Sequence, residues 1–508
     1  MSEMKYYSLR DYAQLLEKEK LLTEFRPGGS SELTVEYLTY DSRKVREGTL
    51  FICKGAAFKE EYLLEAVKKG AVAYVSERPY EGADIPCIIT KDIRRAMPLL
   101  ADMYNNSPWK EMTVIGIGGT KGKSTSAYYM KAIVDDYMKA SGGRESAIFS
   151  SIDIYDGVIR EESHITTPEA VELQEHFRNA LDSGISFVEM EVSSQALKYN
   201  RVDNITFDVG VFLNISEDHI SPIEHEDFED YFSSKLRLFS LCRAAVVNMD
   251  MDYADRVMEA AGSCGRVLTF STRDERADIY CYNIRKTEEG TAFSVRTSDF
   301  DREFMLTMPG LFNVENALAV IGAAVLTNIP VEYIYSGLYR ARSSGRMELY
   351  ESEDKNIIAV VDYAHNKLSF EKLFSSTRDE YPDYDIVSIF GCPGKKAYIR
   401  RKDLGLVAGR YSEKVYLTAE DPGTEPVEQI SKEIARYVEE QKCPYELIED
   451  RGDAIKTAVD KVHGKTVLLI TGKGNETRQK FGTQYVDCKS DVEYVKEVLK
   501  DYDKKHSS

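Results

Sequence analysis

The sequence has no long apolar run and no excess of positive charge. No stretch of about 18 apolar residues occurs, so no membrane-spanning helix is expected, and the first 20 residues lack the apolar core of a signal peptide. Lys and Arg number 66 against 85 Asp and Glu, which gives a net charge of −19. This balance argues against a general nucleic-acid binder and against a binder of anionic membrane surfaces. An anionic substrate would require a local cationic pocket.

Cysteine, glycine and proline are scattered or ordinary in number. The eight cysteines form no CxxC pair, so we expect reduced, mostly buried thiols in a cytoplasmic protein and no structural zinc site. The 32 glycines and 14 prolines exclude a fibrous or largely disordered chain. Hydrophobic residues make up 43% of the 508 residues. This length and composition predict about three domains, each with its own core.

Short apolar runs alternate with helix-like segments along most of the chain. Strands separated by helices indicate mostly parallel sheets with crossover helices, and therefore an α/β fold. The starts of the strand–helix sets predict domains over 1–110, 111–342 and 343–508. We expect strands at 49–53, 72–75, 85–90, 112–117, 187–192, 207–213, 244–248, 357–361, 385–390, 414–418 and 467–471, and helices at 60–69, 93–104, 124–138 and 427–440.

A glycine-rich segment connects the strand expected at 112–117 to the helix that follows. It reads Val114-Ile-Gly-Ile-Gly-Gly-Thr-Lys-Gly-Lys-Ser-Thr125. Glycines let backbone N–H groups turn toward phosphate oxygens, and a helix N-terminus attracts these oxygens. Lys123 would reach the terminal phosphates and the Ser124 hydroxyl a magnesium ion. The segment predicts an ATP or GTP site rather than a turn without ligand, although its first glycine lies one position too early for GxxxxGK[ST].

This loop and seven later segments resemble the motifs of the Mur ligases, in the family's order. The TTP, MEVSS, GRME and DYAH segments resemble those of the MurE-type tripeptide synthetases, and Asp41-Ser-Arg43 resembles their nucleotide-sugar domain. The resemblance runs from about Tyr40 to Gln479. The seven segments are Thr166–Pro168, Met190–Ser194, Phe207–Asn214 with Asp218-His219, Leu311–Ala317, Gly345–Glu348, Asp362–His365 and Gly472–Gly474.

The resemblance implies a cytoplasmic ligase of peptidoglycan synthesis, a step that cell shape and division depend on. Such ligases use ATP to phosphorylate a carboxylate of a UDP-N-acetylmuramoyl precursor, and an amine then attacks the acyl phosphate. The implied domains are an N-terminal UDP-sugar-binding domain, a central P-loop ATPase domain and a C-terminal Rossmann-like domain that binds the amino acid. Closure of the third domain should accompany catalysis. We expect a monomer without nucleic-acid or membrane partners.

The resemblance also assigns residues to ATP and Mg²⁺. Ser124 and Glu191 would bind one Mg²⁺, because hard cations take hydroxyl and carboxylate oxygens, and His219 would bind a second metal ion. The alternatives are a surface carboxylate for Glu191 and a capping or core histidine for His219. Lys121 replaces the family's usual Asn and adds a cation beside the phosphates. The expected ATP-binding residues are Gly119, Thr120, Lys121, Gly122, Lys123, Ser124, Thr125, Asn313, Arg346, Asp362 and His365.

Lys235 aligns with the lysine that carries a carbamate in these ligases. A carbamate turns a cation into an anion that can bind a metal ion. Spacing alone favours a solvated helix lysine here, whereas the resemblance implies a metal-bridging catalytic residue that acts with Lys123 and His219.

The muramoyl dipeptide is expected on residues of the first two domains. Arg201 suits a substrate with carboxylates, because Arg binds them bidentately; the alternative is an exposed arginine. Ser42 and Arg43 would contact the UDP part. The complete expected set is Ser42, Arg43, Thr166, Thr167, Ser193 and Arg201.

The segment Glu420-Asp-Pro-Gly423 bears on which amino acid is added. Family members that add meso-diaminopimelate carry DNPR, whose arginine pairs with the far carboxylate, and Gly423 stands in its place. Without that partner a second carboxylate would be desolvated at a cost. The segment resembles the L-lysine-adding subgroup; L-ornithine stays open, because one methylene is worth only about 1–3 kcal/mol. Glu420, Asp421 and Glu476 would hold the side-chain ammonium, Arg401 the α-carboxylate, and Gly472 belongs to the same site.

Two alternatives compete with this interpretation. Folylpolyglutamate synthetase shares the loop and the acyl-phosphate chemistry, but it gives no reason for the segment before residue 110. A nucleotide-gated scaffold without chemistry is disfavoured by the joint presence of Lys123, Glu191, His219 and Lys235.

Overall fold

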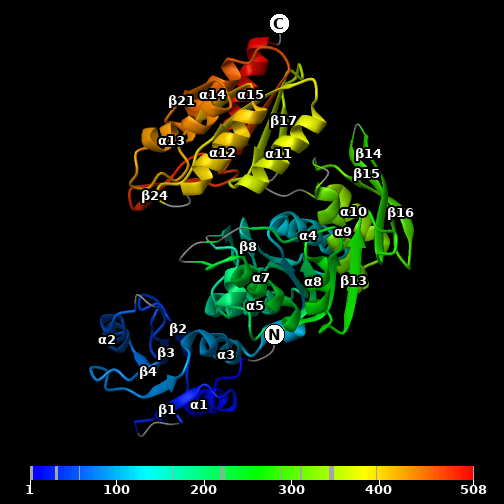
Figure 1. Cartoon of the computed structure of the whole chain (residues 1–508). Coiled ribbons are helices and arrows are strands. Elements are labelled where there is room, and N and C mark those ends of the chain that lie inside the picture. Colours follow the sequence, from blue (N-terminus) through cyan, green and yellow to red (C-terminus); the bar gives the residue numbers. More distant parts are fainter. Residues whose placement is uncertain are drawn as a thin grey trace. The chain divides into compact units, whose positions relative to one another are not determined.

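The computed structural model describes residues 4–506 except 29–31, 56–57, 164, 218–219, 221–223, 288, 309, 311, 342–347 and 396–397. The chain forms two compact units. Figure 1 shows the whole chain coloured along the sequence. The first unit comprises Met1–Tyr282, Val295–Arg302 and Ala317–Leu338, and the second Asn283–Ser294, Glu303–Asn316 and Tyr339–Ser508. Within the described ranges, no helix has the length and apolar composition of a membrane span.

The first unit begins with a small α/β layer. Its five described strands follow the order β1-β5-β4-β3-β2, with β1 antiparallel to β5 and the other pairs parallel. Helices α1 and α3 pack on one face of this sheet and α2 packs on the other. The elements are α1 (Leu9–Lys18), β1 (Leu22–Arg26), β2 (Tyr37–Thr39), β3 (Thr49–Ile52), α2 (Glu60–Lys68), β4 (Ala71–Ser76), β5 (Cys87–Thr90), α3 (Ile93–Asn105) and the 3₁₀ helix η1 (Pro108–Glu111).

A larger sheet follows, with eleven strands among the described residues. Its order is β16-β15-β14-β13-β12-β11-β6-β10-β7-β8-β9. The elements are β6 (Thr113–Gly118), α4 (Lys123–Ala140), β7 (Ala147–Phe149), β8 (Asp153–Tyr155), β9 (Arg160–Glu162), α5 (Ala170–Asp182), β10 (Phe187–Glu191), α6 (Ser194–Lys198), β11 (Phe207–Phe212), α7 (Phe228–Leu236), η2 (Arg237–Leu241), β12 (Cys242–Asn248), α8 (Ala254–Ala261), β13 (Arg266–Ser271), β14 (Ile279–Thr287), β15 (Gly290–Arg296), β16 (Asp301–Leu306), α9 (Phe312–Leu326) and α10 (Val331–Arg340).

The register of the central strands brings four strand ends to one edge of this sheet. β6 is parallel to β10 and to β11, so that Glu191 pairs with Ile117 and Phe212 with Gly118. β7 is parallel to β10 on its other side. Ligands of parallel α/β sheets bind beyond the carboxyl ends of the strands. The loops after β6, β7, β10 and β11 therefore meet where a ligand is expected.

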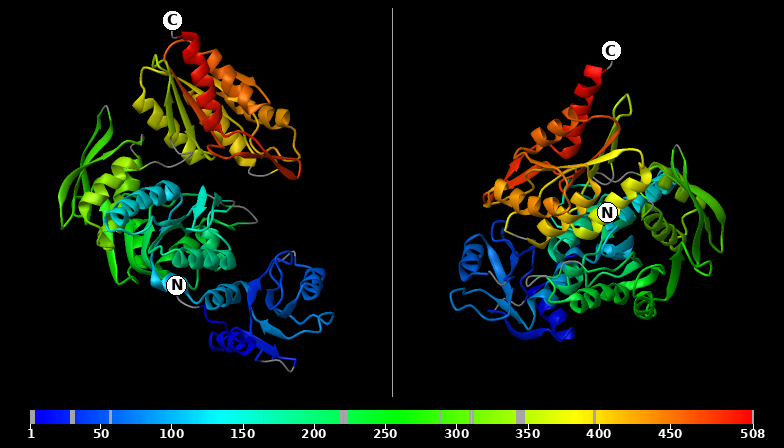
Figure 2. Two further views of the ribbon diagram at one scale, coloured as in Figure 1. Left: turned by 180° about the vertical axis from the view of Figure 1, so that it is seen from behind. Right: turned by 45° about the horizontal axis from the view of Figure 1, so that its top comes forward.

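The second unit is built on a sheet whose strands are buried on both faces. Ile358 and Val360 face α11, α12 and α13, whereas Ile357, Ala359 and Val361 face α14 and α15, as a period of two requires. Figure 1 shows the side with α11–α13, and the rear view in Figure 2 shows α15 in red. The elements are β17 (Glu348–Glu351), β18 (Ile357–Asp362), α11 (Lys367–Glu380), β19 (Asp385–Phe390), α12 (Tyr398–Tyr411), β20 (Lys414–Leu417), α13 (Val427–Glu440), β21 (Tyr445–Leu447), α14 (Arg451–Asp460), β22 (Thr466–Thr471), β23 (Arg478–Phe481), β24 (Gln484–Asp487) and α15 (Asp491–His506).

In the part that the structure describes, this second sheet has the order β17-β18-β22-β19-β20-β21, with only β17 antiparallel to its neighbour. Asp362 pairs with Thr471, and β19 is parallel to both β22 and β20, so the segments after β18, β22 and β20 share one edge. The expected α/β class with mostly parallel sheets is confirmed. The expected helix at 427–440 has the same bounds as α13. The antiparallel edge strands and the β23–β24 hairpin were not among the expected elements.

Candidate active site

The glycine-rich loop lies between β6 and α4, as expected. Gly119 has φ +137°, and a Cβ atom there would lie 2.9 Å from Leu213 Cβ, so only glycine fits. The segment after β11 holds the loop in place. The backbone N–H of Thr120 donates to Asn214 O at 3.0 Å, and that of Lys121 donates to Asn214 Oδ1 at 2.8 Å. The loop is therefore preorganised before any phosphate arrives.

Lys123 and Lys235 converge on this loop from two helices. Lys123 Nζ donates to Gly119 O at 3.1 Å, and Lys235 Nζ donates to the same carbonyl at 2.7 Å. Lys235 is only 3% exposed, so the alternative of a solvated helix lysine is wrong. With both lysines as ammonium groups, positive charge is concentrated beside the loop although the whole chain carries a net charge of −19.

Glu191 is connected to the phosphate loop through Ser151. Ser151 donates to Glu191 Oε1 from its backbone N at 2.8 Å and from its hydroxyl at 3.1 Å. Ser151 Oγ also lies 3.0 Å from Ser124 Oγ. Glu191 is 1% exposed, which rules out the surface-carboxylate alternative. Sequence reasoning missed Ser151, although its place directly after the apolar strand β7 is a usable signal.

The residues expected to hold the dipeptide contact the backbone of Glu191 rather than its carboxylate. Thr167 Oγ1 donates to Glu191 O at 2.9 Å, and the Ser193 backbone N donates to Thr167 Oγ1 at 3.0 Å. Arg201 is buried, not exposed, and lies 2.8 Å from Glu169. Glu169 also pairs with Lys54 at 2.5 Å. Sequence reasoning missed Glu169, the partner of Arg201, and Lys54, the second partner of Glu169.

Several expected residues lie outside this cluster. Ser42 donates to Glu65, and Arg43 pairs with Asp41; both contacts stay within the small N-terminal layer. Thr166 is half-buried beside Thr167. His219 and Arg346 lie outside the described residues.

Asn313, Asp362 and His365 belong to the second unit. Asn313 is buried at the start of α9 and accepts from Asn316 Nδ2 at 3.1 Å. Asp362 ends β18, its Oδ1 accepts from the backbone N of Ala364 at 2.7 Å, and its carbonyl accepts from Gly472 N. His365 Nδ1 lies 2.7 Å from Tyr363 O.

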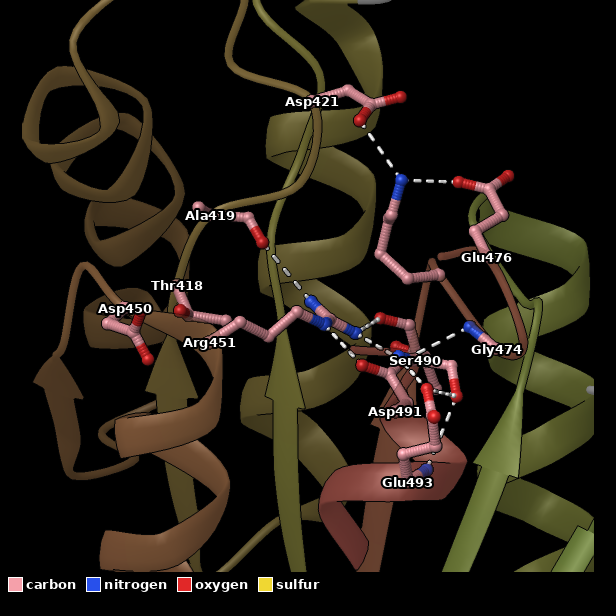
Figure 3. Close-up of polar contacts among 12 residues, drawn as sticks. Thr418, Ala419, Asp421, Asp450, Arg451, Gly474, Glu476, Ser490, Asp491 and Glu493 are labelled. Carbon is pink, nitrogen blue, oxygen red and sulfur yellow. Dashed lines mark hydrogen bonds and ion pairs between the residues drawn. The ribbon is translucent and has the colours of Figure 1, made fainter. Parts of the chain in front are cut away.

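A lysine already occupies the expected acidic cluster of the second unit. Lys473 Nζ lies 3.0 Å from Asp421 Oδ1 and also pairs with Glu476, as Figure 3 shows for the two labelled carboxylates. Two of the three expected carboxylates are thus neutralised within the protein. No ion pair of Glu420 is found among the described residues; burial raises the pKa of Glu420 to about 7, and its carboxylate lies against Gly472.

Arg401 is also engaged inside the protein. It is 2% exposed, and its guanidinium donates to both oxygens of Glu425 at 2.8 and 2.7 Å and to Glu433 at 2.6 Å. The structure therefore does not bring Arg401 into contact with Glu420, Asp421 or Glu476. Arg451 and, to a smaller extent, Arg400 lie close enough to Glu420 to lower the pKa of that carboxyl.

Comparison with known proteins decides the family. The Mur ligase middle domain matches residues 117–324, and the Mur ligase glutamate ligase domain matches residues 345–474. A UDP-N-acetylmuramyl-tripeptide synthetase of Lactobacillus delbrueckii subsp. bulgaricus is 34% identical over 98% of this chain and 99% of its own. A UDP-N-acetylmuramoyl-L-alanyl-D-glutamate--L-lysine ligase of Streptococcus pneumoniae is 37% identical over 92% of this chain and 94% of its own. The chain belongs to the Mur ligase family.

Solved structures agree on the fold of this Mur ligase. A UDP-N-acetylmuramoyl-L-alanyl-D-glutamate--2,6-diaminopimelate ligase superposes with a TM-score of 0.67 at 22% identity, covering 98% of this chain and 99% of its own. The MurF ligase of Thermotoga maritima in complex with ADP gives 0.63 at 17% identity, covering 93% and 99%. At these identities the likeness concerns the fold alone.

Proposed function

We propose that this Mur ligase adds L-lysine to UDP-N-acetylmuramoyl-L-alanyl-D-glutamate with ATP, as a cytoplasmic step of peptidoglycan synthesis. One observation carries the proposal. The carboxylate of Glu191 is connected through Ser151 to Ser124 of the phosphate loop, while its backbone carbonyl accepts from Thr167 of the dipeptide set. A triphosphate and a carboxylate substrate would therefore meet at a single strand end. The lysine-ligase relative supports the choice of amino acid.

The proposed reaction proceeds in two transfers. A carboxylate oxygen of the D-glutamyl residue attacks the γ-phosphorus of ATP, ADP leaves, and an acyl phosphate forms. The α-amine of lysine then attacks the carbonyl carbon, phosphate leaves with the former carboxylate oxygen, and the amine loses a proton. Lys123 and the loop N–H groups that do not donate to Asn214 neutralise the charge that builds up on the phosphates. Thr167, Ser193 and Arg201 orient the carboxylate.

Mg²⁺ suits the donors at the loop. Ser124 Oγ and the Glu191 carboxylate offer hydroxyl and carboxylate oxygens, which this cation prefers. In the described part of the chain, no group of three or more His, Cys, Asp and Glu side chains gathers to hold a metal ion; His219, the further proposed ligand, lies outside it. When bound, Mg²⁺ would neutralise phosphate charge.

Carbamylation of Lys235 has an electrostatic rationale in this arrangement. Lys123 and Lys235 donate to one carbonyl, so their two positive charges repel each other. A carbamate on Lys235 would replace that repulsion with attraction. It would also present an anionic oxygen donor to the metal ion. We therefore propose a carbamylated Lys235 as a metal-bridging residue.

The remaining roles follow the family pattern. We propose Ser42 and Arg43 for the UDP part, and Asn313, Arg346, Asp362 and His365 for ATP. The domain limits 1–110, 111–342 and 343–508 and a monomeric state also stay proposals. Each can be tested by substitution, limited proteolysis or sedimentation.

The proposed preference for lysine rests on charge. Gly423 offers no cation to a second carboxylate, whereas the buried Glu420 has no ion pair in the described residues and can accept an ammonium. Lys473 already satisfies Asp421 and Glu476. We therefore give Glu420 the leading role among the three proposed carboxylates.

An amino-acid-dependent phosphate-release assay tests the specificity. Purified protein receives ATP, Mg²⁺ and the sugar-dipeptide, with L-lysine, L-ornithine or meso-diaminopimelate in separate reactions. We expect release with lysine and none above background with meso-diaminopimelate. A preference for meso-diaminopimelate would refute the assignment. A folate substrate replaces the sugar-dipeptide in the control for folylpolyglutamate synthetase activity, and no release is expected there.

A further inference from the structure

A serine, a histidine and an aspartate form a buried chain of hydrogen bonds beside the proposed site. His225 is 0% exposed; its Nε2 lies 3.0 Å from Ser194 Oγ and its Nδ1 lies 3.1 Å from Asp230 Oδ2. An ionised carboxylate only accepts, so Nδ1 carries a proton, and in the neutral imidazole Nε2 then accepts from the Ser194 hydroxyl. The order is therefore Ser194 to His225 to Asp230. Neither sequence motif nor family resemblance pointed to His225.

The same three residue types build the nucleophilic triads of hydrolases. Here the geometry argues against that use. Ser194 is 5% exposed and begins the short helix α6, and His225 is completely covered. A buried hydroxyl offers no surface for an incoming ester or amide. We therefore expect this chain of hydrogen bonds to hold parts of the protein in place rather than to attack a substrate.

His225 joins the elements that carry the proposed catalytic residues. Ser194 follows Ser193, whose hydroxyl caps α6 and lies 3.2 Å from Thr167 Oγ1. Asp230 lies in α7, the helix that carries Lys235, and also pairs with Lys198 of α6 at 2.5 Å. The turn at 193–194 is thus fixed by Thr167 on one side and by His225 on the other.

The contact extends to the phosphate loop. The His225 ring packs edge-on against Tyr231, with 5.2 Å between ring centroids. Tyr231 OH donates to Thr120 Oγ1 at 3.1 Å. One imidazole therefore connects the dipeptide turn, helix α7 and the loop that would bind ATP.

We propose that His225 is a positioning residue of the ligase reaction. Together with Asp230 it orients Ser194, and thereby holds Ser193 and Thr167 in register with Lys235. The inference rests on the proposed function, because the register matters only if a carboxylate is phosphorylated there. A displacement of about 1 Å at a reacting group can cost on the order of 100-fold in rate.

Three variants test the proposal by steady-state kinetics with the sugar-dipeptide, lysine and ATP. They are Ser194→Ala, His225→Gln and the double variant. We expect each single change to lower kcat/KM for the sugar-dipeptide by about 10- to 100-fold. The double variant should lose no more than the worse single one, because both changes break one chain. The Kd for ADP should stay within about three-fold of wild type, since the loop contacts of Asn214 remain.

His176→Gln is the matched control. His176 is also buried in the first unit, and its Nδ1 lies 2.8 Å from Asp156 Oδ2. The His176→Gln variant should show a fall in Tm comparable to that of His225→Gln and a wild-type kcat/KM. Ser194→Ala removes a single oxygen atom, so it keeps the test open if His225→Gln fails to fold.

The outcomes separate this inference from the proposed function. If wild type turns over but Ser194→Ala matches it, or if the two losses multiply, the positioning role is wrong and the proposed function stands. If wild type shows no turnover with any amino acid, both are wrong.

Discussion

Glu189 provides a quantitative test of the structure near the proposed site. It lies on β10, two residues before Glu191, and its side chain is 0% exposed. Neither carboxylate oxygen makes a hydrogen bond of normal geometry, and the nearby Lys131 and Ser146 offset the effect of burial only in part. Burial raises the pKa of Glu189 from 4.5 to about 8, so the folded protein holds this carboxyl protonated at neutral pH. Sequence reasoning did not single it out.

The sign of the pH dependence follows from proton binding. In the unfolded chain Glu189 loses its proton above about pH 4.5, whereas the folded protein keeps it until about pH 8. The folded state therefore binds more protons in this window, and the free energy of unfolding falls as pH rises. Three pH units at about 1.4 kcal/mol each give a loss of about 4 kcal/mol between pH 5 and pH 8.

Glu189→Gln removes this titration. The variant should gain stability relative to wild type by about 4 kcal/mol on going from pH 5 to pH 8, whatever the fixed cost of the buried amide. Urea unfolding of both proteins across this range measures it. Exposed Glu61→Gln is the control and should leave the pH dependence unchanged. If the free energy of unfolding depends on pH in the same way for Glu189→Gln and wild type, the raised pKa of Glu189 is refuted.

Two substitutions address other residues. Lys235→Ala should abolish turnover because it removes the proposed metal-bridging group, and added bicarbonate should not restore activity; wild-type turnover would contradict the role. Arg401→Met should destabilise the protein by about 3–5 kcal/mol, because Glu425 and Glu433 lose their buried partner. A raised KM for lysine with an unchanged Tm would show instead that Arg401 serves the substrate.

Local pattern was enough to predict the fold class and the phosphate loop. Apolar runs of strand length, such as 113–118 and 466–471, are buried on both faces and need no distant information to be recognised. Gly119 and Gly122 have positive φ, which a glycine-rich sequence can signal by itself. Glu191 then lies at the loop, because the parallel neighbours β6 and β10 end at the same edge of the sheet.

The charge partners could not be predicted in the same way. Lys473 meets Asp421 from 52 positions away, and Glu169 meets Lys54 from 115 positions away. Such pairs depend on tertiary packing. In Arg400-Arg401, only the phase of α12 shows which arginine turns inward: Arg401 shares its face with the buried Leu404 and Ala408. A motif shows which residue type stands at a position, but not which distant side chains contact it.

Transfer of oxygen from substrate to phosphate tests the central claim most directly. The D-glutamyl carboxylate of the sugar-dipeptide is labelled with ¹⁸O, and the phosphate released with ATP and lysine is analysed by mass spectrometry. If the D-glutamyl carboxylate of the substrate is converted to an acyl phosphate between Glu191 and the phosphate loop, each phosphate released carries one ¹⁸O atom. Unlabelled phosphate, or no ADP formation with any amino acid, would contradict the account.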